Sequence, residues 1–295
     1  MAKTAKTSAS PSVRKSVASS AVTGTASAQA GKPVSQPPRK VMVIVHGAGS
    51  FPSDYYKPLV AAIEQRLGGP FNYVPVYYAD ITNPLIPGVA PLTAPPDPPA
   101  AAKFKQDFLT EMQRAYDAQQ TSRRAGVAAN SFGTGNVGGI SLVQIIVKEV
   151  GNYLFTPSIA SRIQTRIVAG LDRAAQAYDE IVFATLSLGT VVAFDVLKLF
   201  ADRYKILYWF TTGCPLGKLR CLDVRPPGVG AIAPANVAHW YNLYDTHDVV
   251  ASSIGPEFSD YRLHDIYVEV GNDPISAHDY FNNGQTLDML ADAMR

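Results

Sequence analysis

The sequence is poor in cysteine and in charged residues. It contains two cysteines, Cys214 and Cys221, and 17% of its 295 residues are charged, against 47% that are hydrophobic. So few cysteines exclude a small domain held together by disulfides. The simpler interpretation is that both cysteines are free thiols in a reducing compartment, and a disulfide between them is the alternative. The composition predicts a large hydrophobic core and excludes a disordered protein or a coiled coil.

Targeting, membrane and cofactor signals are also missing from the sequence. The N-terminal residues lack the apolar stretch of a secretory signal. The uncharged run 125–147 is long enough to span a bilayer, but its five glycines and two asparagines make it poorly hydrophobic. The G-x-G-x-x-G match at Gly133, Gly135 and Gly138 lacks a convincing strand before it and an acid after it. We therefore expect a soluble, cytoplasmic protein with no metal, no cofactor, no membrane span and no nucleic-acid partner; organelle targeting stays open.

Charge is unevenly distributed along the chain. The formal net charge is +2, but the first 40 residues hold seven of the 26 basic residues and no acidic residue, which leaves residues 41–295 with 19 basic and 24 acidic residues. The N-terminal segment is rich in Ser, Ala, Thr and Lys, and it cannot bury enough apolar surface to offset its ordering entropy. We therefore predict a disordered basic tail over 1–40 and one folded domain over 41–295. A transit role or weak contact with a polyanion is the alternative for the tail.

Apolar patterning in 41–295 alternates between strands and helices. The predicted strands are 41–45, 72–78, 181–186, 206–211, 238–244 and 266–270, and the predicted helices are 53–67, 103–119, 140–150, 159–178, 188–204 and 279–294. This alternation predicts an α/β fold, with a mostly parallel central sheet and helices on both faces. The proline-rich stretch 80–103 and the glycine-rich stretch 121–139 predict an inserted cap, or lid, over about 80–160.

The strand predicted at 181–186 runs into the next helix through a single serine, Ser187, within Thr185-Leu-Ser-Leu-Gly189. A serine at such a turn adopts a strained backbone conformation that lifts its hydroxyl clear of the sheet edge. The first N–H group of the helix, that of Leu188, then faces a developing oxyanion. Taken alone, the pattern is equally typical of a serine that caps an ordinary helix.

This stretch resembles the nucleophile elbow, G-x-S-x-G, of the α/β-hydrolase superfamily, with Thr185 in place of the first glycine. The order of the following elements is similar to that family too. Acids stand in a turn after a later strand, at Asp245 and Asp248, and a histidine, His278, follows the last strand. The resemblance covers about 41–295, and within it 80–160 matches as a variable cap. It implies an α/β-hydrolase fold.

The resemblance also implies catalytic roles. Ser187 would attack an acyl carbon, and His278 would take its proton and pass it to the leaving group. A carboxylate would hold the imidazole in the required tautomer. Asp248 is favoured for that carboxylate because Asp248-Val-Val is similar to the family's D-x-V signature, and Asp245 is the alternative.

The remaining histidines and the loop after the first strand complete the candidate site. The N–H of Leu188 and that of either Gly47 or Ala48 would form the oxyanion hole, with His46 shaping the loop and not acting as the base. His239 and His264 are expected to be structural. His247 is expected to be a turn residue or to line the mouth of the site.

Together these features favour a serine hydrolase that cleaves a small-molecule acyl ester, as a carboxylesterase or lipase does. Thioesterase, acyltransferase or peptidase chemistry on the same triad is one alternative. A catalytically inactive relative that binds a partner is another. The sequence leaves the oligomeric state open.

Overall fold

The computed structural model describes residues 37–82, 97–123, 136–137, 140–221, 232–274 and 276–295. By its contacts the chain divides into Met1–Pro37 and Pro38–Arg295, and every described helix and strand lies in the second unit. Three predictions fall partly or wholly outside the described residues. They are the tail up to residue 36, the middle of the proline-rich stretch, and the glycine motif at Gly133, Gly135 and Gly138.

Six strands form a parallel central sheet. They are β1 (Lys40–Val45), β2 (Tyr73–Val76), β5 (Glu180–Leu186), β6 (Ile206–Thr212), β7 (Val237–Tyr244) and β8 (Leu263–Tyr267). Their order across the sheet is β2-β1-β5-β6-β7-β8, and each neighbouring pair is parallel. The predicted α/β class with a parallel sheet is thus confirmed. Two short strands, β3 (Asn136–Val137) and β4 (Ile140–Ser141), form a separate antiparallel pair.

The strand β1 shows why its sequence is a continuous apolar run. Side chains of a strand point alternately to the two faces of the sheet. Val41, Val43 and Val45 pack into one hydrophobic cluster. Met42 and Ile44 pack into another on the opposite face. A strand buried on both faces needs no polar residues, which is the pattern that β1 has.

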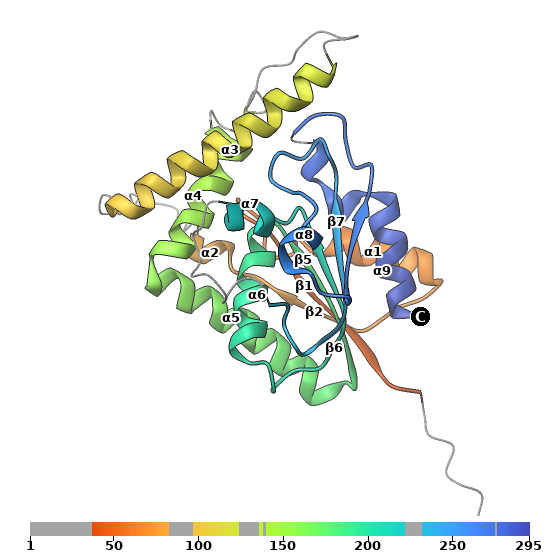
Figure 1. Ribbon diagram of the computed structural model, residues 1–295. Coiled ribbons are helices and arrows are strands. Elements are labelled where there is room, and N and C mark those ends of the chain that lie inside the picture. The colour runs from red at the N-terminus through yellow and green to blue at the C-terminus, as the bar shows by residue number, and fades with distance from the viewer. Residues whose placement is uncertain (1–36, 83–96, 124–135, 138–139, 222–231, 275) are drawn as a thin grey trace, which may run out of the picture. The chain divides into compact units, whose positions relative to one another are not determined.

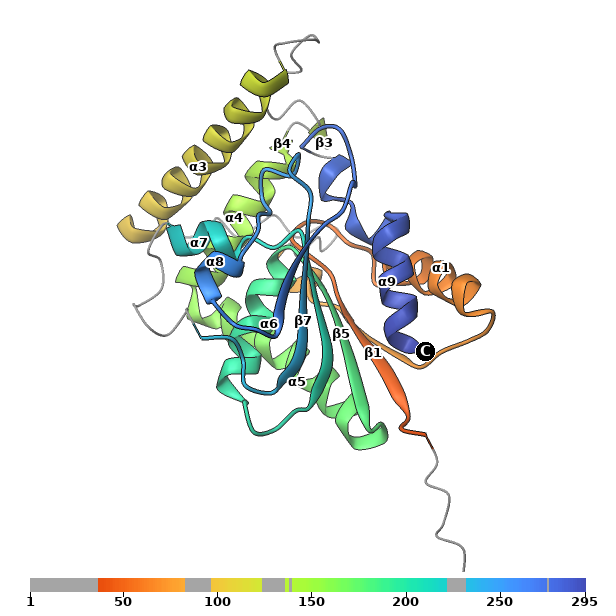
Figure 2. The same ribbon diagram turned by 45° about the vertical axis from the view of Figure 1, so that its right-hand side comes forward.

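Helices cover both faces of the sheet, as Figures 1 and 2 show. On one face α1 and α9 pack against each other and against the strands. On the other face lie α4, α5 and α6, with α3 packed on α4. The helices are α1 (Lys57–Leu67), α2 (Ala79–Thr82), α3 (Pro99–Arg123), α4 (Leu142–Phe155), α5 (Pro157–Ala177), α6 (Leu188–Leu199), α7 (Leu216–Cys221), α8 (Gly255–Phe258) and α9 (Gly284–Met294). None of these described helices has both the length and the apolar character needed to cross a bilayer.

Two predicted elements near the C-terminus have different bounds in the structure. The strand predicted at 266–270 is β8, which begins and ends three residues earlier. The helix predicted at 279–294 begins at Gly284, because the side chain of Asn283 accepts the N–H of Thr286 at 2.9 Å and so caps a helix there. Two short 3₁₀ turns precede it, Ser276–His278 and Tyr280–Asn282. His278 therefore lies on a 3₁₀ turn and not on the last helix.

The order of the strands creates a crevice between β1 and β5. From β1 the chain moves to β2 on one side, while β5 pairs with the other side of β1. The connections that leave the carboxyl ends of β1 and β5 therefore run in opposite directions. In open α/β sheets, ligands bind at such a switch point, outside the carboxyl ends of the strands. Ser187 and the loop that starts at His46 both lie there.

Candidate active site

Ser187 joins β5 directly to α6 in a conformation that few residues adopt. Its φ is 52° and its ψ is −123°. A non-glycine residue in such a region costs on the order of 1–3 kcal/mol, so the surrounding contacts must hold it in place. The N–H of Ser187 donates to the carbonyl of Thr212 on β6 at 2.9 Å, and the Thr190 hydroxyl donates to the carbonyl of Ser187 at 2.6 Å. Both ends of the turn are thereby fixed.

Two glycines allow the turn and the loop after β1 to touch. A Cβ atom on Gly189 would lie 2.4 Å from the carbonyl oxygen of His46. A Cβ atom on Gly47 would lie 2.7 Å from the Cβ of Ser187 and 3.4 Å from its Oγ. Neither position has room for a side chain, so the backbone of the loop lies directly against the serine.

Thr185, which departs from the G-x-S-x-G pattern, is buried, and its hydroxyl both donates and accepts a hydrogen bond. Its hydroxyl donates to the carbonyl of Phe210 and accepts the indole N–H of Trp209, both at 3.0 Å. Its side chain points toward β6, where these partners lie. The turn therefore accommodates a threonine at this position without a buried polar group being left unpaired.

The structure brings His278 and Asp248 together. The Nδ1 atom of His278 lies 2.8 Å from Oδ2 of Asp248, and both residues are buried. The hydroxyl of Tyr280 donates to the same carboxylate oxygen at 3.0 Å, and the N–H of Val250 donates to Oδ1 at 2.8 Å. The carboxylate is thus held on both oxygens, and it fixes Nδ1 of the imidazole as a donor.

Asp245, the alternative acid, has different partners. One of its oxygens accepts the backbone N–H and the ring Nδ1 of His247, at 2.8 and 3.0 Å. The other accepts the N–H groups of Val270 and Gly271, at 2.7 and 3.1 Å. Its carboxylate therefore joins the turn after β7 to the segment after β8. The structure does not place it against His278.

Two buried polar atoms at this site have no hydrogen-bond partner among the residues that the structure describes. They are Oγ of Ser187 and Nε2 of His278. The end of β6 lies between Ser187 and His278. The N–H of Ser187 donates to the carbonyl of Thr212, the last residue of β6. The next residue, Gly213, is so close to His278 that a Cβ on it would lie 2.7 Å from Cε1 of the imidazole. A buried polar group without a partner costs about 1–3 kcal/mol, so it needs a reason.

His46 lies in the loop after β1 as a neutral imidazole. Its Nδ1 lies 2.8 Å from the carbonyl oxygen of Gly47 and must therefore carry the hydrogen, while its Nε2 accepts the N–H of Tyr78 at 3.1 Å. Burial lowers the pKa of His46 to about 4, against a smaller opposing effect of the Gly47 hydrogen bond. With both nitrogens in use and a low pKa, His46 cannot serve as the general base.

Two backbone segments lie beside Ser187. Leu188 is the first residue of α6, where the N–H groups have no partner within the helix. Gly47 and Ala48 lie in the loop that touches the serine. The next residue of that loop, Gly49, donates its N–H to Oε2 of Glu149 on α4 at 3.2 Å. These are the N–H groups from which an oxyanion hole could form.

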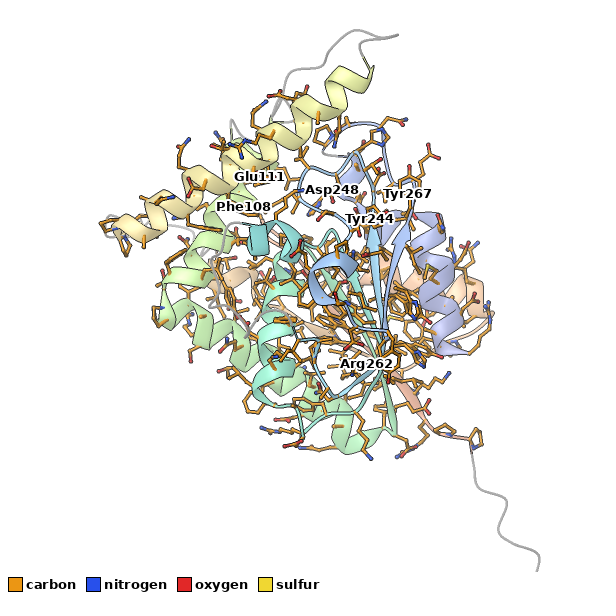
Figure 3. All side chains as sticks on the ribbon, viewed as in Figure 1. Phe108, Glu111, Tyr244, Asp248, Arg262 and Tyr267 are labelled. Atoms are coloured by element: carbon orange, nitrogen blue, oxygen red, sulfur yellow. The ribbon has the colours of Figure 1, made fainter. Side chains whose placement is uncertain are left out.

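One described cavity, of about 230 Å³, lies beside Asp248 and between α3 and the turn after β7. Gln119 and Thr246 line it from these two sides, and the Gln119 amide donates to the Thr246 carbonyl. Figure 3 shows Asp248 at the end of the sheet that α3 passes, and Arg262 at the opposite end. A larger cavity, of about 650 Å³, lies near Arg262, at the amino ends of the strands and thus away from Ser187.

The other residues singled out in the sequence lie away from the Ser187–His278 pair or are engaged elsewhere. His239 and His264 are exposed and stack on tyrosine rings of the sheet. Cys214 is a buried free thiol whose pKa burial raises to about 11. The side chain of Cys221 lies outside the described residues. Within the described residues, no three His, Cys, Asp or Glu side chains lie close enough to hold a metal ion.

Sequence reasoning missed two residues that contact the site. Glu149 lies in the helix predicted at 140–150 and is 3% exposed, and its neighbours Ile146 and Val150 are buried and apolar. An acid on the apolar face of a helix is a signal that could have been read. Tyr280 carries no such signal, because its role depends on the 3₁₀ turns that fold it back onto Asp248.

No protein-family model matches the chain, and no match was found among the curated proteins or among the solved structures.

Proposed function

We propose that this chain is a serine hydrolase of the α/β-hydrolase superfamily that cleaves the ester of a small-molecule acyl group. One observation carries the proposal: Oγ of Ser187 and Nε2 of His278 are buried without described partners, while Nδ1 of the same imidazole is held by Asp248. A nucleophile and a base that await a substrate would leave these two atoms unpaired. The parallel sheet and the position of Ser187 at the switch point after β5 support the same proposal.

The first half of the reaction forms an acyl-enzyme. Oγ of Ser187 attacks the carbonyl carbon of the ester while its proton moves to Nε2 of His278. The carbonyl oxygen becomes an oxyanion, which accepts hydrogen bonds from the N–H of Leu188 and that of Gly47 or Ala48. When the tetrahedral intermediate collapses, the C–O bond to the alcohol breaks, and the alkoxide leaves with the proton from Nε2.

The second half restores the serine. A water molecule gives a proton to Nε2 of His278 and attacks the acyl carbon, and the acid is released as Ser187 Oγ regains that proton. In both halves Asp248 keeps the imidazole in the tautomer whose Nε2 can accept a proton and stabilises the positive charge that then forms. The strained Ser187 turn fixes the backbone from which Oγ attacks.

The surroundings of Ser187 favour an uncharged acyl group. The serine is 1% exposed, and Ala48 and Leu188 beside it are buried. A negatively charged substrate group would have to lose its hydration in a site that already holds the buried carboxylate of Asp248, which is costly. An ester of an apolar acid meets no such penalty.

Labelling and turnover test the proposal. A fluorophosphonate probe and a series of p-nitrophenyl esters of different chain length are used with the wild type and with Ser187→Ala and His278→Ala. The exposed serine variant Ser161→Ala serves as the matched control. We expect labelling and turnover in the wild type and the control, and a loss of about 10³-fold or more in the other two. A wild type that neither labels nor turns over any ester would contradict the proposal and favour a binding protein. Labelling without ester turnover would redirect the assay to thioesters and amides.

A further inference from the structure

Glu149 is a buried carboxylate that the proposed reaction does not use directly. It lies on α4, within the predicted cap, and is 3% exposed. Its Oε2 accepts the N–H of Gly49 at 3.2 Å. No Lys, Arg or His side chain of the described residues forms an ion pair with it.

This hydrogen bond completes the fixation of the loop 46–49. On one side, the Tyr78 hydroxyl donates to the carbonyls of His46 and Gly47, at 2.7 and 3.2 Å. On a second side, Gly47 lies against Ser187. Glu149 holds the far end, at Gly49, whose φ of 116° is a conformation that glycine permits. The N–H groups of Gly47 and Ala48 lie between these fixed points.

Keeping a carboxylate in this place is unfavourable for folding. Burial raises the pKa of Glu149, against smaller opposing effects of the Gly49 N–H and the Thr82 hydroxyl. The neighbouring buried positions of α4 are apolar, so an apolar residue at 149 would avoid the cost of desolvation. An unfavourable buried acid that contacts the loop beside the nucleophile suggests a task other than stability.

We propose that Glu149 is a positioning residue: by accepting the N–H of Gly49, its carboxylate sets the loop so that the N–H groups of Gly47 and Ala48 face the oxyanion formed at Ser187. The inference rests on the proposed hydrolysis. It implies that the predicted cap contributes to catalysis through α4 and not only by covering the site.

The test compares three variants of the full chain with the wild type. Glu149→Gln keeps a carbonyl oxygen that can accept from Gly49, whereas Glu149→Met removes the acceptor at similar volume. Val147→Ala removes buried apolar volume from the same helix and leaves the Glu149 carboxylate in place. The measurements are kcat and KM on the best p-nitrophenyl ester, hydrogen exchange at the Gly49 amide, and the free energy of unfolding.

We expect Glu149→Met to lower kcat by about 10- to 100-fold with KM within about twofold, since a misplaced oxyanion donor weakens transition-state binding more than substrate binding. The Gly49 amide should exchange faster in this variant. Glu149→Gln should stay within about threefold of the wild type in kcat, and Val147→Ala should lose stability but keep kcat.

Three results would overturn the inference: wild-type kcat in Glu149→Met, an equal loss in Glu149→Gln, or an equal loss of kcat in Val147→Ala. Each of these three results requires an active wild type, so each would contradict the role of Glu149 and leave the proposed hydrolase function intact. A wild type that neither labels nor turns over an ester would contradict both the hydrolase function and the role of Glu149.

Discussion

Oδ2 of Asp248 lies 2.8 Å from Nδ1 of His278, whereas each donor on the carboxylate of Asp245 comes from the turn after β7 or from the segment after β8. Two acids three residues apart thus have separate tasks. One holds an imidazole at the site, and the other holds two backbone segments in place. Their substitutions should therefore affect different measurements.

We predict that Asp248→Asn lowers kcat by about 10³- to 10⁴-fold, because the imidazole loses the acceptor that fixes its tautomer. Asp245→Asn should instead lower the free energy of unfolding by about 1–3 kcal/mol, since its amide group would face N–H donors that need an acceptor. Steady-state kinetics and urea unfolding of both variants check this. Equal loss of kcat in the two folded proteins would contradict the assignment.

Tyr280 links the two acids through one hydroxyl. That oxygen accepts the N–H of Asp245 at 2.8 Å and donates to Asp248 at 3.0 Å. In Tyr280→Phe the buried N–H loses its acceptor, so we expect a loss of about 1–3 kcal/mol in the free energy of unfolding. The matched control is Tyr267→Phe, at a residue that is 46% exposed, and its effect should stay within about 0.5 kcal/mol. Urea unfolding measures both, and similar values would show that the hydroxyl of Tyr280 contributes nothing.

Thr185 is predicted to be the better residue for this turn than the glycine of the family pattern. Thr185→Val leaves the Trp209 indole N–H without its acceptor, and we expect a cost of about 1–3 kcal/mol. Thr185→Ser keeps the hydroxyl and should cost less. Thr185→Gly removes the hydroxyl and places a glycine within β5, which should cost at least as much as the valine. If the glycine variant were more stable than the wild type in urea unfolding, the threonine would be a defect.

Much of the fold could be predicted from the sequence because local patterns determine it. The run 41–45 is apolar at every position because β1 is buried on both faces, and such a run has few other uses. Ser187 could be singled out because a strand and a helix meet there without a loop. The bounds of β8 and of α9 were misjudged, since a cap at Asn283 and sheet pairing decide them, and neither appears in periodicity.

The partners at the site were harder to predict than its members. Asp248 and Asp245 differ in what they contact, and the contacts that distinguish them, His278 with Asp248 and Val270 with Asp245, come from segments more than 20 residues away. Glu149 reaches the loop after β1 across 100 residues of sequence. Long-range contacts of this kind depend on how α4 and the 3₁₀ turns pack, which a single sequence does not encode in any local pattern.

The buried neutral His46 predicts how stability depends on pH. Its pKa is about 4 in the folded protein, against 6.5 for an ordinary imidazole. Between these values the unfolded chain binds more protons than the folded protein, so stability falls as pH decreases through the window. The difference amounts to about 3 kcal/mol between pH 6.5 and pH 4. Glu149 changes stability in the opposite direction. Burial raises its pKa, so the folded protein binds this proton more readily than the unfolded chain, and the contribution of Glu149 to stability rises as pH decreases.

The variant His46→Gln removes the titrating group and isolates its contribution. We predict that the free energy of unfolding of the wild type falls by about 3 kcal/mol more than that of His46→Gln between pH 6.5 and pH 4, since Glu149 and all other acids are common to both proteins. His264→Gln is the control, because that side chain is exposed. Urea unfolding at a series of pH values measures the slopes. A wild-type slope equal to that of His46→Gln would mean that His46 is already protonated or solvated in the folded protein, and its use as a neutral scaffold for the loop would have to be abandoned.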